Sequence, residues 1–546
     1  MKSPILSCAI SLTLALGALN AVYADSATWR TNPISNDWNT AANWTPNTVP
    51  NGPDDIATFA LSQHPDVFVS TDTEVNQVIF NAGASPFNIN VANDQELTVS
   101  GIGITNDSGV AQNFVCPTFA GVVLTNNATA GDMTFFTLKG GHGQKNSGGF
   151  ASFSGNASAG NGTFVLEPVE TPDAYSGGGV FFSGNSSAGN GTFTVQSTSD
   201  MDFSDNSTAG NGTFVVEGGL ILFESFSGIA TAGNGLFIIN SGSVDFWSDS
   251  SAGNATLIAN PGANGAEGGR IFFENDAHDG GEARIEVFGN GTLDIQFIFG
   301  EFVSVGSIEG NGIIFLGKKK LIAGTNDLST TFSGTIQDSA DLRFPGSLQK
   351  IGNGALTLAG DGSTYTGATT VEGGKLVVAN QSGSGTGTGS VSVNRGKLGG
   401  SGIIAGATTI GTGSGIGAFL APAAAQATSQ PATLTIQSAL TFNADATYSC
   451  TFKAEQHGDT TRTKTSMVIA NGVTINSEAT IELIGHITGA LNQGTALTQI
   501  SNTSADPISG TFSNLPDGSI VTINDNNFQV SYEGGDGNDL TLTVVP

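Results

Sequence analysis

The chain has 546 residues, of which 77 are glycine and 34 are phenylalanine; only 12% are charged, and the formal net charge is −29. A hydrophobic fraction of 38% excludes a disordered chain, and irregular glycine spacing with only 17 prolines excludes collagen. The acidity argues against nucleic-acid binding, because a phosphate-binding surface needs clustered Lys and Arg. Abundant Thr, Val, Ile, Phe, Gly, Ser and Asn favour a large all-β protein with many tight turns.

Residues 1–24 have the form of a secretory signal peptide. Lys2 gives a basic start, residues 5–19 are apolar, and Ala24 ends a small-x-small cleavage site. We therefore expect an exported protein that is secreted or held at the cell surface. No later segment has 18 consecutive apolar residues, so no transmembrane segment is expected in the mature chain. Its two cysteines, Cys116 and Cys450, either pair or serve as small buried hydrophobes, and we favour the second.

Residues 25–112 hold three of the four tryptophans, Trp29, Trp38 and Trp44, followed by strand-like runs. The end of a stacked β structure exposes unpaired strand edges, which must be covered. We therefore predict an N-terminal cap and first coils over this range. The alternative is that the three indoles form an exposed platform for carbohydrate.

The next range, residues 113–300, contains an internal repeat. The sequence AGNGTF at 159–164 recurs at 188–193 and 209–214, and more loosely at 232–237 and 252–257. Its first glycines are separated by 20 to 29 residues, too short a period for a propeller blade. Strand formers separated by Gly and Asn at this period are typical of a β-solenoid, in which each repeat is one coil.

Stacked coils place each side chain on its copy in the next coil, about 4.8 Å away. This predicts an interior phenylalanine column and an asparagine column at a turn, in which the amides hydrogen-bond along the axis. The alternative for the asparagines is an exposed sugar-binding row. The predicted structural ladder consists of Asn161, Asn190, Asn211, Asn234, Asn254, Phe164, Phe193, Phe214 and Phe237.

The densest charged patch lies near the end of this range. It could either bring two carboxylates together for hydrolysis or form an exposed loop, and we favour the loop. Further coils are expected over residues 301–345, where the basic run from Lys318 to Lys320 is interpreted as a solvated turn. The patch consists of Arg270, Glu274, Asp276, His278, Asp279, Glu282 and Arg284.

Residues 346–425 contain a different repeat. It begins with the strand KIGNGALTL at 350–358, continues through a Tyr-Thr-Gly turn at 365–367, and ends with TVEGGKLVV at 370–378. This block resembles the autotransporter-associated β-strand repeat. The resemblance implies a right-handed parallel β-helix of the passenger type, displayed or released outside a bacterial cell, and it implies no catalytic residues.

The C-terminal β region, residues 426–546, shows only short Thr-rich and Ile-rich strands. They are too few and too short for the outer-membrane barrel of a complete autotransporter, which leaves the export route open. Residues 534–539 match the first part of a calcium nonapeptide, but in a single copy without the following hydrophobic position. We predict a Gly-Asp turn there, with a calcium-stabilised module as the alternative.

The sequence therefore predicts an all-β protein: a right-handed parallel β-helix with a Trp-rich N-terminal cap and a short C-terminal β segment. We expect a scaffold or adhesin-like role without catalysis and with no catalytic, cofactor-binding or metal-binding residues. The expected partners are glycans or cell-surface proteins, not nucleic acid. The sequence predicts no particular oligomeric state. The alternative function is an extracellular polysaccharide lyase or glycosidase on the same kind of helix.

Overall fold

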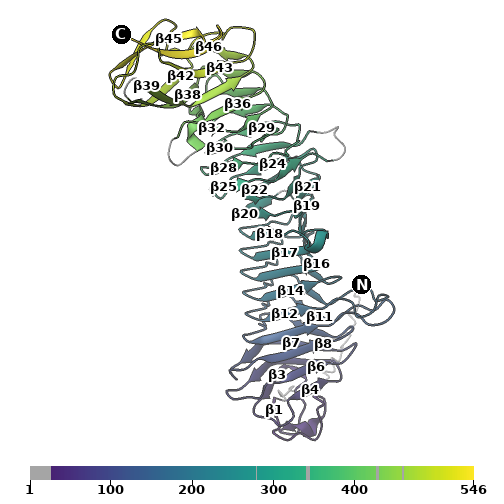
Figure 1. Ribbon diagram of the computed structural model, residues 1–546. Coiled ribbons are helices and arrows are strands. Elements are labelled where there is room, and N and C mark those ends of the chain that lie inside the picture. The colour runs from purple at the N-terminus through teal and green to yellow at the C-terminus, as the bar shows by residue number, and fades with distance from the viewer. Residues whose placement is uncertain (1–25, 278, 340–344, 426–429, 458–459) are drawn as a thin grey trace, which may run out of the picture.

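The computed structural model describes residues 26–277, 279–339, 345–425, 430–457 and 460–546. The predicted signal peptide and His278 lie outside these ranges. The described chain winds into a long rod of stacked coils, with β1 near one end and β45 and β46 at the other (Figure 1). Within these ranges almost all regular structure is β-strand, and the three helices are single 3₁₀ turns: η1 (Ala41–Asn43), η2 (Ala263–Gly265) and η3 (Pro422–Ala425). The predicted all-β solenoid is confirmed.

Each coil contributes strands to three faces of the rod, and each strand pairs in parallel with its copies in neighbouring coils. Face 1 contains the strand that follows each AGNG turn. It consists of β4 (Asp66–Val69), β6 (Asn88–Val91), β8 (Gln112–Cys116), β10 (Thr134–Leu138), β12 (Thr163–Leu166), β14 (Thr192–Gln196), β18 (Thr256–Ala259), β25 (Thr330–Phe332), β28 (Ala355–Leu358), β30 (Lys375–Val378), β32 (Gly396–Gly400), β35 (Ala418–Leu420), β38 (Ala446–His457) and β42 (Thr480–Thr488).

Face 2 contains the next strand of each coil. It consists of β9 (Gly121–Leu124), β11 (Phe150–Phe153), β13 (Gly179–Phe182), β15 (Asp200–Phe203), β19 (Arg270–Asn275), β21 (Thr292–Ile298), β23 (Ile313–Phe315) and β26 (Thr335–Gln337).

Face 3 begins with β1 (Ala27–Trp29) and is reduced to single bridged residues from Thr129 to Ser251. Beyond them it consists of β24 (Lys320–Ala323), β27 (Ser347–Lys350), β29 (Thr369–Val371), β31 (Val391–Val393), β34 (Thr408–Ile410), β37 (Leu440–Phe442) and β41 (Val473–Ile475).

Seven longer strands run round a corner of the rod and serve two faces. They are β3 (Gly52–Phe59), β5 (Thr73–Phe80), β7 (Glu96–Asn106), β16 (Thr213–Ser225), β17 (Leu236–Ser248), β20 (Asp279–Val287) and β22 (Phe302–Gly310).

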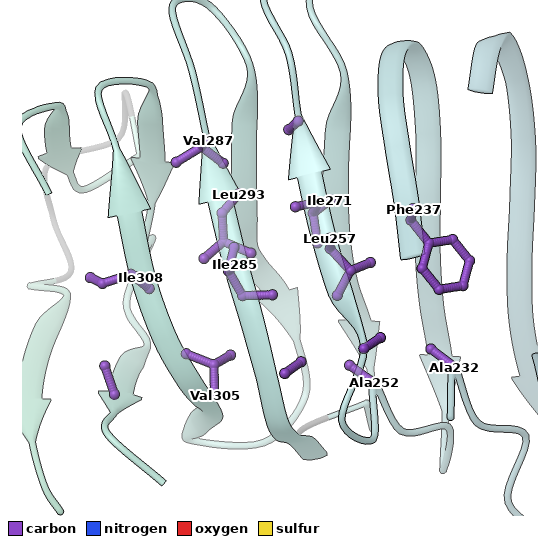
Figure 2. Packing of buried hydrophobic residues seen from close by; sticks show 14 of the residues in the cluster. Ala232, Phe237, Ala252, Leu257, Ile271, Ile285, Val287, Leu293, Val305 and Ile308 are labelled. Atoms are coloured by element: carbon purple, nitrogen blue, oxygen red, sulfur yellow. The ribbon is translucent and has the colours of Figure 1, made fainter. Parts of the chain in front are cut away.

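The alternation of side chains along each strand explains why these sequences form coils. In β12 and β15, alternate residues are buried and the residues between them lie at the surface. The buried residues of successive coils lie on one another: Phe237 is followed in register by Leu257, Ile285 and Ile308 (Figure 2). The rod therefore has one continuous apolar interior.

The C-terminal end is closed by a seven-stranded sheet. Its first four strands continue the parallel stacking, and its last three turn back as antiparallel hairpins, which cover the end of the helix. A further strand, β39 (Thr460–Thr465), pairs antiparallel with β38. The seven strands are β33 (Ile403–Ile404), β36 (Thr433–Ile436), β40 (Met467–Ala470), β43 (Ala496–Asn502), β44 (Ile520–Ile523), β45 (Asn526–Gly534) and β46 (Asp539–Val545).

At the N-terminal end, the two-residue strand β2 (Trp44–Thr45) pairs antiparallel with β1. None of the helices in the described ranges is long and apolar enough to cross a membrane. The predicted handedness of the helix stays a prediction.

Candidate functional site

The repeated AGNG turn connects face 3 to face 1 in each of the central coils. The hydroxyl that precedes the turn accepts a hydrogen bond from the backbone N–H of the first glycine, for example Gly189 N to Ser187 Oγ at 3.0 Å and Gly210 N to Thr208 Oγ1 at 3.0 Å. That glycine has a positive φ, +61° at Gly189 and +60° at Gly210, which favours glycine at this position. The turns stack because Asn211 N donates to the carbonyl of Gly189.

The five asparagines of these turns form a continuous amide ladder along one corner of the rod. Each Nδ2 donates to the Oδ1 of the asparagine one coil earlier, at distances of 3.0 to 3.2 Å. All five are exposed, so each amide keeps one N–H and one lone pair for solvent or a ligand. The hydrogen bonds between successive asparagines are those expected of a structural ladder. The exposure of the same side chains is what a sugar-binding row would also need. It runs through Asn161, Asn190, Asn211, Asn234 and Asn254.

A carboxylate starts the ladder. Asp132 stands where an asparagine would stand one coil earlier, and it accepts a hydrogen bond from Asn161 Nδ2. Because an ionised carboxylate only accepts, it fixes the direction in which every amide of the ladder points. The same arrangement starts two shorter ladders, Asp66–Asn88–Asn113 and Glu217–Asn240–Asn260.

A second exposed asparagine ladder was not predicted. It joins Asn127, Asn156, Asn185 and Asn206 at the corner between faces 2 and 3, with amide distances of 3.1 to 3.5 Å. The sequence carried a signal for it, since FSGN or FSDN precedes the turn at 153–156, 182–185 and 203–206.

The four predicted phenylalanines lie in one interior column beneath the Asn ladder. Successive ring centroids are 4.8, 5.0 and 4.4 Å apart and the rings are within 11° of parallel. Phe114 and Phe136 extend the column toward the N-terminus. The column consists of Phe164, Phe193, Phe214 and Phe237 together with these two rings.

A second column, from face 2, meets the first edge to face. Phe182, for example, contacts Phe193 at 6.1 Å and 77°, an arrangement that aromatic rings favour. Its members follow one another at 4.6 to 5.1 Å: Phe153, Phe182, Phe203, Phe223, Phe246 and Phe273. The phenylalanine excess is therefore shared by two columns.

The three N-terminal tryptophans are buried, so the carbohydrate-platform alternative is wrong. Trp38 and Trp44 have no exposed surface and Trp29 is 2% exposed. Their rings pack on one another and on Phe59, and the indole N–H groups of Trp38 and Trp44 donate to the carbonyls of Pro50 and Trp38. They fill the first coils from inside.

The predicted charged patch does not converge on one point. Glu274 lies near the end of β19, and Asp276 follows this strand at the corner between faces 2 and 3. Glu282 lies in the next corner, directly after Asn254 in the stack of AGNG turns. The carboxylate of Asp279 accepts hydrogen bonds from Ser251 Oγ and Gly281 N, both at 2.9 Å. This separation contradicts the alternative in which these carboxylates act together in hydrolysis.

The two arginines of the patch are also separated, each with its own partners. Arg270 Nη2 lies 3.1 Å from Asp294 Oδ2, and Arg284 pairs with Glu286 at 3.1 Å and with Glu309. Hydrogen bonding to Glu309 raises the pKa of Arg284.

The basic run differs from its prediction at its centre. Lys318 and Lys320 are exposed, but Lys319 is only 5% exposed and its Nζ donates to the carbonyl of Gly300 at 2.6 Å, in the preceding coil. Burial lowers the pKa of Lys319, and the positive charge of Lys318 lowers it further. The turn is therefore only partly solvated.

The two cysteines are free and buried near opposite ends of the rod. Burial raises the pKa of both thiols to about 12. The interpretation as small buried hydrophobes agrees with this placement.

The Gly-Asp segment at 534–539 forms the turn of the antiparallel hairpin β45–β46. Asp539 Oδ1 accepts a hydrogen bond from Asn502 N at 2.9 Å, which ties the turn to β43. Within the described residues, no group of three or more His, Cys, Asp and Glu side chains is placed to hold a metal ion.

The repeat at 350–378 directs its most distinctive side chains inward. Lys350 is 2% exposed, and its ammonium donates to the carbonyl of Ile351. Burial lowers the pKa of Lys350 to about 8. Tyr365 is fully buried, with its hydroxyl 2.6 Å from Thr369 Oγ1. These residues build the coil, as expected for a scaffold motif.

Comparison with known proteins identifies this repeat. The family model of the passenger-associated-transport-repeat matches residues 348–378, which confirms the resemblance found in the sequence. No curated protein matches the chain. Among solved structures, the chain is similar to the Hap adhesin of Haemophilus influenzae, with 11% identity and a TM-score of 0.26, over 91% of this chain and 65% of that chain. The chain thus spans less than two-thirds of the Hap chain.

Proposed function

We propose that the chain is a secreted or cell-surface β-helix protein of the passenger type, with a scaffold or adhesin-like role and no catalytic activity. The observation that carries the proposal is the unbroken stacking of face 3 from Thr129 to Thr474. It gives the rod a long, evenly built exterior, which suits many weak contacts with glycans or cell-surface proteins.

Two further features support this role. The passenger-associated-transport-repeat lies within the rod, and the outer corners carry neutral amide ladders that keep hydrogen-bonding groups free. The two arginines of the predicted charged patch are held in ion pairs, Arg270 with Asp294 and Arg284 with Glu309.

Surface display is tested with an epitope inserted in the open loop around Gly413, where Ile416 is 86% exposed. Protease added to intact bacteria that express the chain is expected to remove the epitope. Protection of the epitope until the cells are lysed would contradict display.

The adhesin-like role is tested with the purified chain from residue 25 onward, applied to glycan arrays and to host and sibling cells. We expect saturable binding to at least one of them. If display is observed but no surface binds, the adhesin-like role is wrong and a scaffold role is left.

A further inference from the structure

A groove lies on the corner between faces 1 and 2. At this corner β16 and β17 turn tightly at Gly218 and Gly242, whereas the next coil carries the longer loop that includes η2, the teal coiled ribbon beside β16 and β18 (Figure 1). The loop overhangs the tight corners and leaves a groove of about 670 Å³. This lies within the range of roughly 300–1,000 Å³ that is common for small-molecule sites.

The floor and walls of the groove are fixed before any ligand arrives. Gly242 has a φ of +79°, and a Cβ there would lie 2.2 Å from the carbonyl oxygen of Gly219, so the floor stays bare backbone. Asn290 holds the overhanging loop, because its Oδ1 accepts from Gly262 N at 2.8 Å and its Nδ2 donates to the carbonyl of Ala266 at 2.7 Å.

Arg270 provides a positioned donor at the edge of the groove. Its guanidinium lies 3.7 Å above the ring of Phe272 and donates to Asp294, whose side chain is 8% exposed. Asp294 also accepts from the backbone N–H and the side chain of Gln296. The guanidinium is thus held in place, yet the Arg270 side chain is 40% exposed and has further N–H groups to donate.

Asp245 provides one carboxylate oxygen, Oδ1, that the described residues leave unused, while Ser243 hydrogen-bonds the same carboxyl group. It lies two residues beyond Ser243, which lines the groove, and it is in register with Phe272 on the outer surface of face 2. Its Oδ1 is buried and accepts no hydrogen bond within the described part of the chain. Leaving such an atom without a donor costs about 1–3 kcal/mol. Because Oδ1 is buried, the Asp245 side chain has to turn outward before a ligand hydroxyl can donate to it and offset this cost.

An apolar surface continues the same path across face 2. Trp247 is two residues beyond Asp245 and therefore faces the same side of β17. Phe226, which is 77% exposed, contacts its ring edge to face at 5.5 Å. Ring faces of this kind pack against the C–H faces of sugars while polar groups beside them bind hydroxyls.

The charges around the groove select the class of ligand. The carboxylates of Asp245, Glu267, Glu274 and Asp294 outnumber the one guanidinium of Arg270, so an anionic ligand is repelled. Serine and threonine hydroxyls, carboxylate acceptors and the Arg270 donors together match a ligand whose groups both donate and accept hydrogen bonds. Neutral sugars have this property at every hydroxyl.

We propose that this groove, with the adjoining outer surface of β17 and β19, binds a short segment of a neutral polysaccharide. The inference deepens the proposed function, on which it rests, by naming the ligand class and the place of binding.

The test is calorimetry with the chain from residue 25 onward. The neutral ligands are hexasaccharides of the cello, manno and N-acetylchito series, and an oligogalacturonate of equal length is the anionic comparison. At least one neutral oligomer is expected to bind saturably, and at least tenfold more tightly than the oligogalacturonate. Asp245→Leu should weaken this binding tenfold or more.

Asp202→Leu is the matched control. Asp202 lies in the same outward column as Asp245, two coils earlier and outside the groove, and Leu222 occupies the coil between them. Leucine is therefore accepted in this column, so both variants should fold, as circular dichroism checks. Ser243→Val is a second groove variant and should also weaken binding.

Four results would overturn the proposal: no binding of any neutral oligomer to the folded chain, equal weakening by Asp202→Leu and Asp245→Leu, tighter binding of the oligogalacturonate, or cell adhesion that is unchanged in Asp245→Leu. Release of new reducing ends from a bound oligomer would overturn its non-catalytic character. Cell adhesion that survives Asp245→Leu would show that the proposed function holds while this site is wrong.

Discussion

The central coils and the coils around the passenger-associated-transport-repeat build the same three-faced helix in different ways. We call the coils from Phe114 to Phe273 the aromatic region and those from β24 to β35 the aliphatic region. In the aromatic region identical rings stack at 4.4 to 5.1 Å, and small residues such as Ala188 and Ala209 line the facing corner.

The aliphatic region has no such ring stacks among its described residues. Its core on face 1 is the column Leu356, Leu376, Leu398 and Leu420, and its coils approach one another through glycines. A Cβ on Gly389 would lie 1.9 Å from the carbonyl oxygen of Gly367, and one on Gly367 would lie 2.2 Å from that of Gly346. Coils of the aromatic region also approach closely at glycines, since a Cβ on Gly149 would lie 1.9 Å from the carbonyl oxygen of Cys116. The two regions therefore differ in the side chains that stack in register, which are phenylalanine rings in one and leucines in the other.

The largest expected effect is the loss of a stacked ring. Phe193→Ala removes a fully buried side chain with partners above, below and at its edge, and should cost about 3–5 kcal/mol of unfolding free energy. Leu376→Ala in the aliphatic region should cost less, about 2–4 kcal/mol, since no ring stacking is lost. Urea unfolding of both variants checks this order, and equal or reversed costs would contradict the comparison.

The sequence revealed the aromatic region more completely than the aliphatic one for a physical reason. When identical side chains stack in register, the same residue types recur in the sequence once per coil. The positions of Phe164 and Asn161 in their columns could therefore be predicted from the sequence. The second ring column and the second Asn ladder carried a weaker signal, because the letters around them change from FSGN at 153–156 and 182–185 to FSDN at 203–206 and FESF at 223–226.

The candidate groove could not be found in this way. It depends on the loop with η2, which lies beside two coils that turn tightly, and on a ring, Phe272, that lies under the arginine of its own strand. The burial of Lys319 was missed for a similar reason, since its partner is the carbonyl of Gly300, which belongs to a different coil.

The second prediction concerns close approach of the backbone. Gly389→Ala in the aliphatic region should cost about 1–3 kcal/mol, because the new methyl group meets the backbone of the neighbouring coil rather than a flexible side chain. Thr388→Ala, at the exposed neighbouring position, should change stability by less than about 0.5 kcal/mol. Thermal unfolding of the two variants distinguishes them, and a silent Gly389→Ala would show that these coils are less tightly stacked than described.

The third prediction separates the regions by pH. Burial raises the pKa of Asp202 to about 6 in the aromatic region, assisted by Asp200 and Glu224, and burial lowers the pKa of Lys350 to about 8 in the aliphatic region. The folded state therefore binds the extra proton of Asp202 between about pH 4 and 6, and its contribution to stability is lost as pH rises through this window. The unfolded state binds the extra proton of Lys350 between about pH 8 and 10.5, so its contribution to stability grows as pH rises.

Urea midpoints of the natural chain, Asp202→Asn and Lys350→Met across pH 4–10.5 check both windows. The difference between the natural chain and Asp202→Asn should change only in the acid window, and the difference for Lys350→Met only in the alkaline window. Parallel curves throughout would contradict the burial of these two groups.

The smallest expected effect is on the exposed amide ladder. Asn211→Asp replaces the donor that faces Asn190 with a carboxylate oxygen and should cost about 0.5–1.5 kcal/mol. Asp132→Asn at the start of the ladder keeps an acceptor for Asn161 and should be close to neutral. Chemical unfolding of both checks the direction of the ladder, which is wrong if Asp132→Asn is the more damaging change.

The central claim is that both regions belong to one continuous stack, in which distance follows the number of coils and not the length of sequence. Spin labels at Thr129 and Thr231 are separated by four ladder steps through Ser158, Ser187 and Thr208, and labels at Ser304 and Ser392 by four steps through Ile322, Gln349 and Thr370. Pulsed electron paramagnetic resonance should give ~19 Å between backbone positions for both pairs and ~58 Å for Thr129 with Thr409. Unequal short distances, or a Thr129–Thr409 distance no longer than the short ones, would contradict the continuous helix.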